Sequence, residues 1–161
     1  MQTILELVIP NGIQTGPALL AQSVTIPVGG ALNNIRFRWT LANGAPPLAG
    51  ALYILDREYS GPLTALSTAP GFVARSIRIE LDEYVFDPAV TLAGGRQYWF
   101  GADTAVKYLC SQPTSGDLYP GGDLYFQGSL TGGEHSYVRA FMFNQSERLD
   151  AGFSLRAARV P

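Results

Sequence analysis

The segment from Ala31 to Leu41 alternates apolar and polar side chains along most of its length. Its apolar members are Ile35, Phe37, Trp39 and Leu41, and asparagine, arginine and threonine stand between them. Successive side chains of a β-strand point to opposite faces of the sheet, so a period of two predicts a strand with one face in the core. A chain built from such strands must bury that face against a second layer.

The segment from Ser76 to Asp82 repeats this alternation. We expect Ile77, Ile79 and Leu81 to face the core, and the serine, arginine, glutamate and aspartate between them to face solvent. Less regular patterns give the remaining candidate strands. These are Thr3–Ile9, Ala21–Pro27, Ala51–Asp56, Gln97–Ala102, Val106–Cys110, Asp123–Gln127, Tyr137–Phe143 and Gly152–Val160.

Glycine and proline supply the breaks between these segments. The chain of 161 residues contains 18 glycines and 11 prolines, which gather in short clusters such as Asn43–Pro47 and Tyr119–Gly122. A short helix is expected only around Pro62–Ser67. Short strands separated by such turns predict an all-β fold, an antiparallel β-sandwich of about 8–10 strands. The length suits a single domain over residues 1–161.

The net charge and the few reactive side chains exclude several classes of function. A net charge of −2 gives no polybasic surface, so nucleic acid is not an expected partner. His135 and Cys110 are the single histidine and cysteine, which excludes an intrachain disulfide and removes the commonest metal and nucleophile arrangements. Glu80, Asp82 and Glu83 lie close in sequence, but the alternation predicts a solvated strand edge rather than a glycosidase pair. We therefore expect no enzyme and no cofactor.

Several fragments, read in order, resemble a β-sandwich type similar to carbohydrate-binding modules. The matching stretches are Ala21–Gly30 with Ile35-Arg36-Phe37, Leu48–Tyr53, Val90–Phe100, Tyr119–Gly122 and Phe153–Arg156. Such domains occur in bacterial surface and secreted proteins and in phage virion accessory proteins. The resemblance covers most of the chain from about Ala21 to Val160 and implies a jelly-roll-like sandwich. Its motifs are structural, so it implies no active site.

Four motif residues carry their own structural expectations. We expect Trp99 to lie in the core or on a sheet face, because it follows the turn at Gly94-Gly95 in an aromatic strand. Ser23 and Thr25 should line the outer face of their strand. Gln22 should hydrogen-bond a buried backbone group.

The resemblance, the low charge and the scarcity of catalytic residues predict a non-enzymatic structural or binding protein. The first hypothesis is a phage virion accessory component, such as a capsid decoration, head spike or tail fibre. Its partners would be other virion or surface proteins and further copies of itself, as a homo-oligomer. The alternative is a glycan-binding module or adhesin.

The glycan-binding alternative has a candidate site between Tyr108 and Tyr125. Sugars stack on exposed aromatic rings and hydrogen-bond to neighbouring amides and carboxylates. The region concentrates such side chains. They are Tyr108, Gln112, Asp117, Tyr119, Asp123 and Tyr125.

The sequence also bears on calcium binding and on where the protein is located. A structural calcium ion would use loop carboxylates such as Asp103, Asp117 and Asp123, although their spacing fits no EF-hand. The start at Met1 lacks a basic stretch followed by an apolar run, so no signal peptide is expected. No window reaches the ~18 apolar residues of a membrane span. We therefore expect synthesis in the host cytoplasm and a place in the virion, with the cell surface or the extracellular space as the alternative.

Overall fold

A computed structural model describes residues 1–9, 13–14, 19–110, 119–129, 135–139 and 150–161. The strands are β1 (Gln2–Leu7), β2 (Ile13–Gln14), β3 (Leu20–Thr25), β4 (Leu32–Trp39), β5 (Leu52–Leu55), β6 (Phe72–Ser76), β7 (Ile79–Glu80), β8 (Glu83–Val85), β9 (Gln97–Ala102), β10 (Leu109–Cys110), β11 (Leu124–Ser129), β12 (His135–Arg139) and β13 (Phe153–Arg159). A 3-10 helix, η1 (Leu63–Thr68), lies where the sequence predicts a short helix. Within these described ranges, no helix combines the length and apolar character that crossing a membrane requires.

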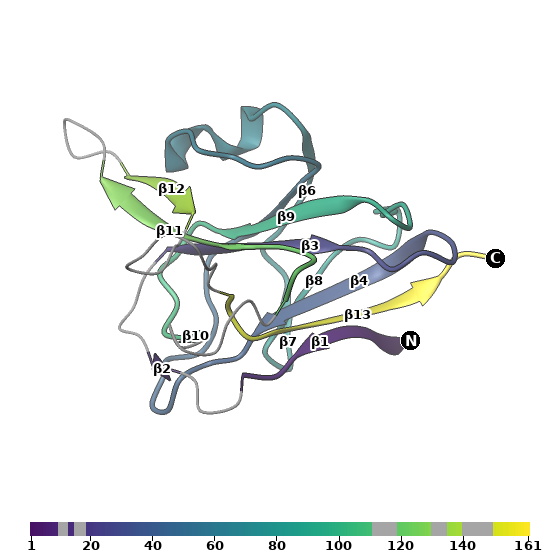
Figure 1. Ribbon diagram of the computed structural model, residues 1–161, viewed down its shortest axis with the longest axis horizontal. Helices are drawn as coiled ribbons and strands as arrows, with labels where there is room; N and C mark the ends of the chain where they lie inside the picture. The colour runs from purple at the N-terminus through teal and green to yellow at the C-terminus, as the bar shows by residue number, and fades with distance from the viewer. Residues whose placement is uncertain (10–12, 15–18, 111–118, 130–134, 140–149) are drawn as a thin grey trace.

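Eleven of these strands form two antiparallel sheets in a sandwich, as predicted (Figure 1). The short strands β2 and β10 pair with each other in a separate two-stranded sheet. The five-stranded sheet has the order β1-β13-β4-β8-β7, and the six-stranded sheet has the order β12-β11-β3-β9-β5-β6. The subsets β1-β13-β4-β8 and β3-β9-β5-β6 have the strand order of a jelly roll. The β11–β12 hairpin extends the second sheet by pairing β11 with β3.

Aromatic rings join the two sheets in the core. Phe37 of β4 is fully buried, and its ring stacks on Phe100 of β9 with 4.6 Å between ring centroids. Trp39 and Phe153 contact the same ring at 4.7 and 5.7 Å. The alternation in 31–41 therefore predicts both the strand and its buried face correctly.

A second apolar cluster lies on the other face of the six-stranded sheet. Trp99 and Tyr125 project from this face and are 1% and 2% exposed. The connection between β5 and β6 covers them with Tyr59 and with Leu66 of η1. The expectation that Trp99 packs on a sheet face is confirmed.

The prediction of one strand over Ser76–Asp82 is wrong. The strand β6 ends at Ser76, and β7 and β8 form a hairpin whose turn residues Leu81 and Asp82 have φ angles of +50° and +61°. Ile77 and Leu81 are 66% and 87% exposed. The turn reverses the chain two residues after β7 begins, so Tyr84 of β8 takes the buried position instead.

We expect Leu81→Asn to stabilise the fold. A left-handed backbone costs a leucine roughly 1–2 kcal/mol, and asparagine adopts it more readily. Leu81 is exposed in the single chain, so its replacement removes little burial from the monomer, and the monomer's unfolding free energy is the quantity to compare. Chemical denaturation at several protein concentrations should show an unfolding free energy about 1 kcal/mol higher. Ile77→Asn is the control, since Ile77 is exposed without a left-handed backbone; an equal gain in both variants would contradict the turn explanation.

Candidate functional site

The segment 119–125 lies against β3 and is held there by hydrogen bonds. The Tyr119 hydroxyl accepts a hydrogen bond from the Thr25 N–H at 2.9 Å, and the Tyr119 N–H donates to Asp150 at 3.0 Å. Burial raises the pKa of Tyr119. The hydroxyl and the backbone N–H of Tyr119 thus both have partners within the fold.

Asp123 anchors the same segment through its backbone. Its N–H donates to the Ser23 Oγ at 2.7 Å, and its carbonyl accepts from the Ser23 N–H at 2.9 Å. At Gly122 the chain approaches so closely that a Cβ atom would lie 1.7 Å from the Ser23 carbonyl oxygen. Ser23 and Thr25 do lie on the outer face of β3, but this segment covers them.

The other predicted site residues do not gather on one surface. Tyr108 is buried in the core between the sheets, whereas Tyr125 belongs to the cluster on the opposite face of the six-stranded sheet. Gln112 and Asp117 lie outside the described residues. The use of this region for glycans stays a prediction, and its buried rings Tyr108 and Tyr125 present no open platform in this structure.

Gln22 fulfils its expected structural role. It is fully buried, its Oε1 accepts from the Ala151 N–H at 3.0 Å, and its Nε2 donates to the Ser23 carbonyl and to Asp150 at 3.2 Å each. This network links β3 to the residues just before β13.

Asp103 also has a structural role, because its carboxylate accepts a hydrogen bond from the Ala51 N–H at 2.7 Å. Over the described ranges, no three histidine, cysteine or acidic side chains gather as metal ligands.

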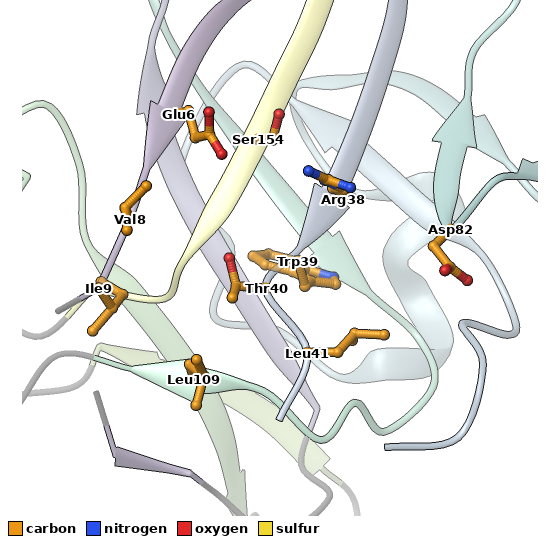
Figure 2. Close-up of a pocket in the computed structure, with 10 residues that line it drawn as sticks. All are labelled: Glu6, Val8, Ile9, Arg38, Trp39, Thr40, Leu41, Asp82, Leu109 and Ser154. Atoms are coloured by element: carbon orange, nitrogen blue, oxygen red, sulfur yellow. The ribbon is translucent and has the colours of Figure 1, made fainter. Parts of the chain in front are cut away.

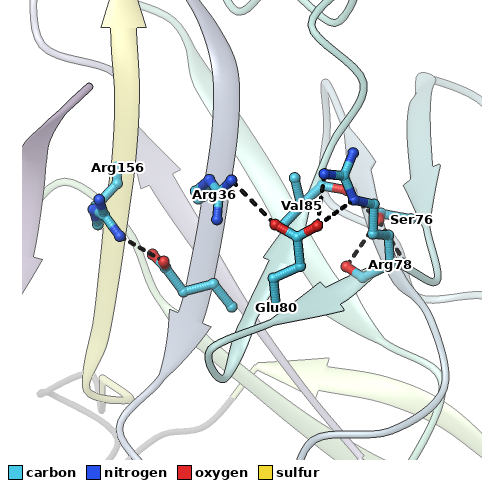
Figure 3. Close-up of polar contacts among 7 residues, drawn as sticks. Arg36, Ser76, Arg78, Glu80, Val85 and Arg156 are labelled. Carbon is cyan, nitrogen blue, oxygen red and sulfur yellow. Dashed lines mark hydrogen bonds and ion pairs between the residues drawn. The ribbon is translucent and has the colours of Figure 1, made fainter.

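Ion pairs cross the outer face of the five-stranded sheet (Figure 3). Glu80 of β7 pairs with Arg78 at 2.6 Å and with Arg36 of β4 at 3.2 Å. The hydrogen bond from Arg78, followed by the nearby positive charges, lowers the pKa of Glu80. Arg156 of β13 donates to Glu83 of β8 at 2.6 Å.

Glu83 departs from the expected solvated strand edge. Its side chain is 3% exposed and lies against Arg156. One carboxylate oxygen takes the Arg156 hydrogen bond, and the other is buried with no hydrogen-bond partner among the residues described. The carboxylate therefore depends on one guanidinium for its neutralisation.

One side of the sandwich carries the outer strands of both sheets. In the part of the chain described, β6 pairs only with β5, and β7 pairs only with β8. Two residues separate β6 from β7, so the end of one edge strand lies near the start of the other. Phe72, Ile77 and Leu81 are 42%, 66% and 87% exposed along these edges. We call this surface, from Phe72 to Leu81, the β6–β7 side.

Removal of the Glu83 counter-charge should destabilise the fold. Arg156→Ala leaves a buried carboxylate without a cation, at a cost of roughly 1–3 kcal/mol in unfolding free energy. Glu83→Gln added to this variant should recover part of the loss. Arg57→Ala is the control, because its pair with Asp56 is exposed and such pairs contribute about 0–1 kcal/mol. Equal losses in Arg156→Ala and Arg57→Ala, by urea denaturation, would contradict this role for Glu83.

Tyr84 should make the fold sensitive to alkali. Burial, with the negative charge of Asp103, raises the pKa of Tyr84 from 10.0 to about 12, and its hydroxyl donates to the Ala49 carbonyl at 2.8 Å. A raised folded-state pKa gives stability that is present below pH 10 and is lost as the pH rises through about 12.

Tyr84→Phe should therefore lower the unfolding free energy at pH 7 by about 1 kcal/mol, because the hydrogen bond is lost. It should also make the loss of unfolding free energy above pH 10 smaller. Denaturation at a series of pH values measures both effects. A decline as steep as that of the unmodified protein would assign alkaline sensitivity to other groups.

Comparisons with protein-family models, with curated proteins and with solved structures give no match to this chain. The β-sandwich is observed directly in the two sheets and their strand order. The finer resemblance to carbohydrate-binding modules stays a prediction from sequence motifs.

Proposed function

We propose that this protein is a non-enzymatic structural component, an accessory protein of a virion, that assembles with further copies of itself through the β6–β7 side. The observation that carries the proposal is the coincidence of two open sheet edges with three exposed apolar side chains on that side. The virion setting is supported by the sequence resemblance alone.

Open edges favour assembly because their backbone groups can pair with another strand. An edge strand presents a row of N–H and C=O groups, and exposed apolar side chains next to it add burial to the pairing. Here Phe72 lies on β6 itself, and Ile77 and Leu81 flank the short strand β7. Contact with a partner would bury all three.

A second copy of the chain is the partner that this geometry favours. Two identical edges related by a twofold axis meet in antiparallel orientation, and the strands described here all pair in that orientation. Pairing of β6 with its twofold-related copy would continue the six-stranded sheet across the dimer. A stable interface needs roughly 800 Å² from each partner, which requires the neighbouring apolar side chains as well as the strand.

Light scattering coupled to size-exclusion chromatography tests the proposal. We expect a dimer or larger oligomer at micromolar concentration. The double variant Ile77→Asp, Leu81→Asp should dissociate at least tenfold more readily, because it places two charges in the contact. Circular dichroism should show the same sandwich in both proteins.

Val28→Asp is the matched control. Val28 is 81% exposed, close to the 87% of Leu81, but lies in the connection between β3 and β4. It should leave the oligomer unchanged. A protein that remains monomeric at micromolar concentration, or an oligomer that the double variant and Val28→Asp weaken equally, would overturn assembly through the β6–β7 side.

A further inference from the structure

A groove of about 460 Å³ opens at one end of the five-stranded sheet (Figure 2). Its walls come from β1, β4, β13 and the β7–β8 turn, and Leu109 of β10 contributes from below. The volume falls within the range of small-molecule sites, which is about 300–1,000 Å³. None of the sequence motifs described above points to this groove.

The strand register places opposite charges across the groove. Glu6 of β1 pairs with Ser154 of β13, and Ser154 pairs with Arg38 of β4. Glu6 and Arg38 are therefore two strands apart, about 9.5 Å between backbones. Figure 2 shows the two charged side chains on either side of the short Ser154. Ser154 itself is 4% exposed, and its short side chain lies between them.

Arg38 differs from its neighbours on the same face. Arg36, Arg78 and Arg156 each pair with a carboxylate. For Arg38, the described structure shows no hydrogen bond or ion pair, and it shows no ion pair for Glu6 or Asp82, which line the same groove. The groove thus presents one guanidinium and two carboxylates that are not neutralised by each other.

The apolar part of the groove is aliphatic. Val8, Leu41 and Leu109 line it, and Val8 is 69% exposed. Trp39 also borders it but is only 2% exposed, so no aromatic face is open for stacking on a sugar ring. The Trp39 indole N–H is buried with no hydrogen-bond partner in the described part of the chain. These features favour a ligand with an aliphatic body and ionic groups.

We propose that this groove binds a free α-amino acid with an aliphatic side chain. The ligand carboxylate pairs with Arg38, and its ammonium pairs with Glu6 across Ser154, with Asp82 adding to the negative wall. The two backbones are about 9.5 Å apart, so the flexible Glu6 and Arg38 side chains can each reach one end of the amino-acid head group through a charge-assisted hydrogen bond of about 2.8 Å. The aliphatic side chain lies on Val8, Leu41 and Leu109.

The charge balance selects a zwitterion over simpler ligands. Glu6, Asp82 and Arg38 sum to a net negative charge, so a carboxylic acid alone meets two like charges. An amine alone leaves the Arg38 guanidinium without a partner. A peptide carries its two terminal charges at opposite ends, whereas a free amino acid presents them together.

Isothermal titration calorimetry with L-leucine tests the proposal. We expect binding of L-leucine, and at least tenfold weaker binding of 4-methylpentanoate, which lacks the ammonium, and of 3-methylbutylamine, which lacks the carboxylate. The tripeptide trileucine should also bind at least tenfold more weakly. Arg38→Gln and Glu6→Gln should each weaken L-leucine binding by about tenfold or more.

Arg96→Gln is the control, because Arg96 is an exposed arginine outside the groove. It should bind L-leucine as the unmodified protein does, and thermal unfolding should show that all variants fold. Absence of heat at millimolar L-leucine would overturn the proposal. So would equal binding of leucine and 4-methylpentanoate, binding that Arg38→Gln leaves unchanged, or tighter binding of trileucine.

Discussion

The stacked contact between Phe37 and Phe100 is the interaction on which the sandwich depends. The two rings lie 4.6 Å apart at nearly parallel planes and come from opposite sheets. Trp39 and Phe153 pack around the Phe37 ring, so this group fixes the separation of the layers and the face that each strand turns inward. Once Phe37 and Trp39 face the core, the alternate residues of the same sheet must face outward. Arg36, Arg38 and Glu6 therefore lie on its outer face.

Much of the fold could be predicted from alternation. It finds β4 and its buried face, and less regular apolar patterns find β9 and β13 as strands. The sheet position of Trp99 follows from the Gly94-Gly95 turn and the aromatic strand after it. Alternation fails at Ser76–Asp82 because the chain turns at Leu81 and Asp82, which are not the residues that usually mark a two-residue hairpin turn. The alternation of apolar and polar residues continues in the sequence through this turn, although the strand has ended.

The candidate sites were harder to predict, for a physical reason. Tyr108 and Tyr125 are 17 positions apart in the numbering, yet they pack in different apolar clusters. Conversely, residues from distant segments become cross-strand neighbours because β13 lies between β1 and β4. These residues are Glu6, Ser154 and Arg38. Alternation could assign Arg38 to a solvated face, but strand register, which local sequence does not encode, decides what stands opposite it.

The position of β13 also constrains when the fold can form during synthesis. β13 comes last among the strands, yet it lies in the interior of its sheet, where it pairs with both β1 and β4 (Figure 1). Until residues 153–159 have left the ribosome, β1 has no partner in its sheet and β4 lacks one of its two neighbours. The sandwich therefore closes after translation of its last strand, and a nascent chain that pauses earlier exposes the apolar face of β4.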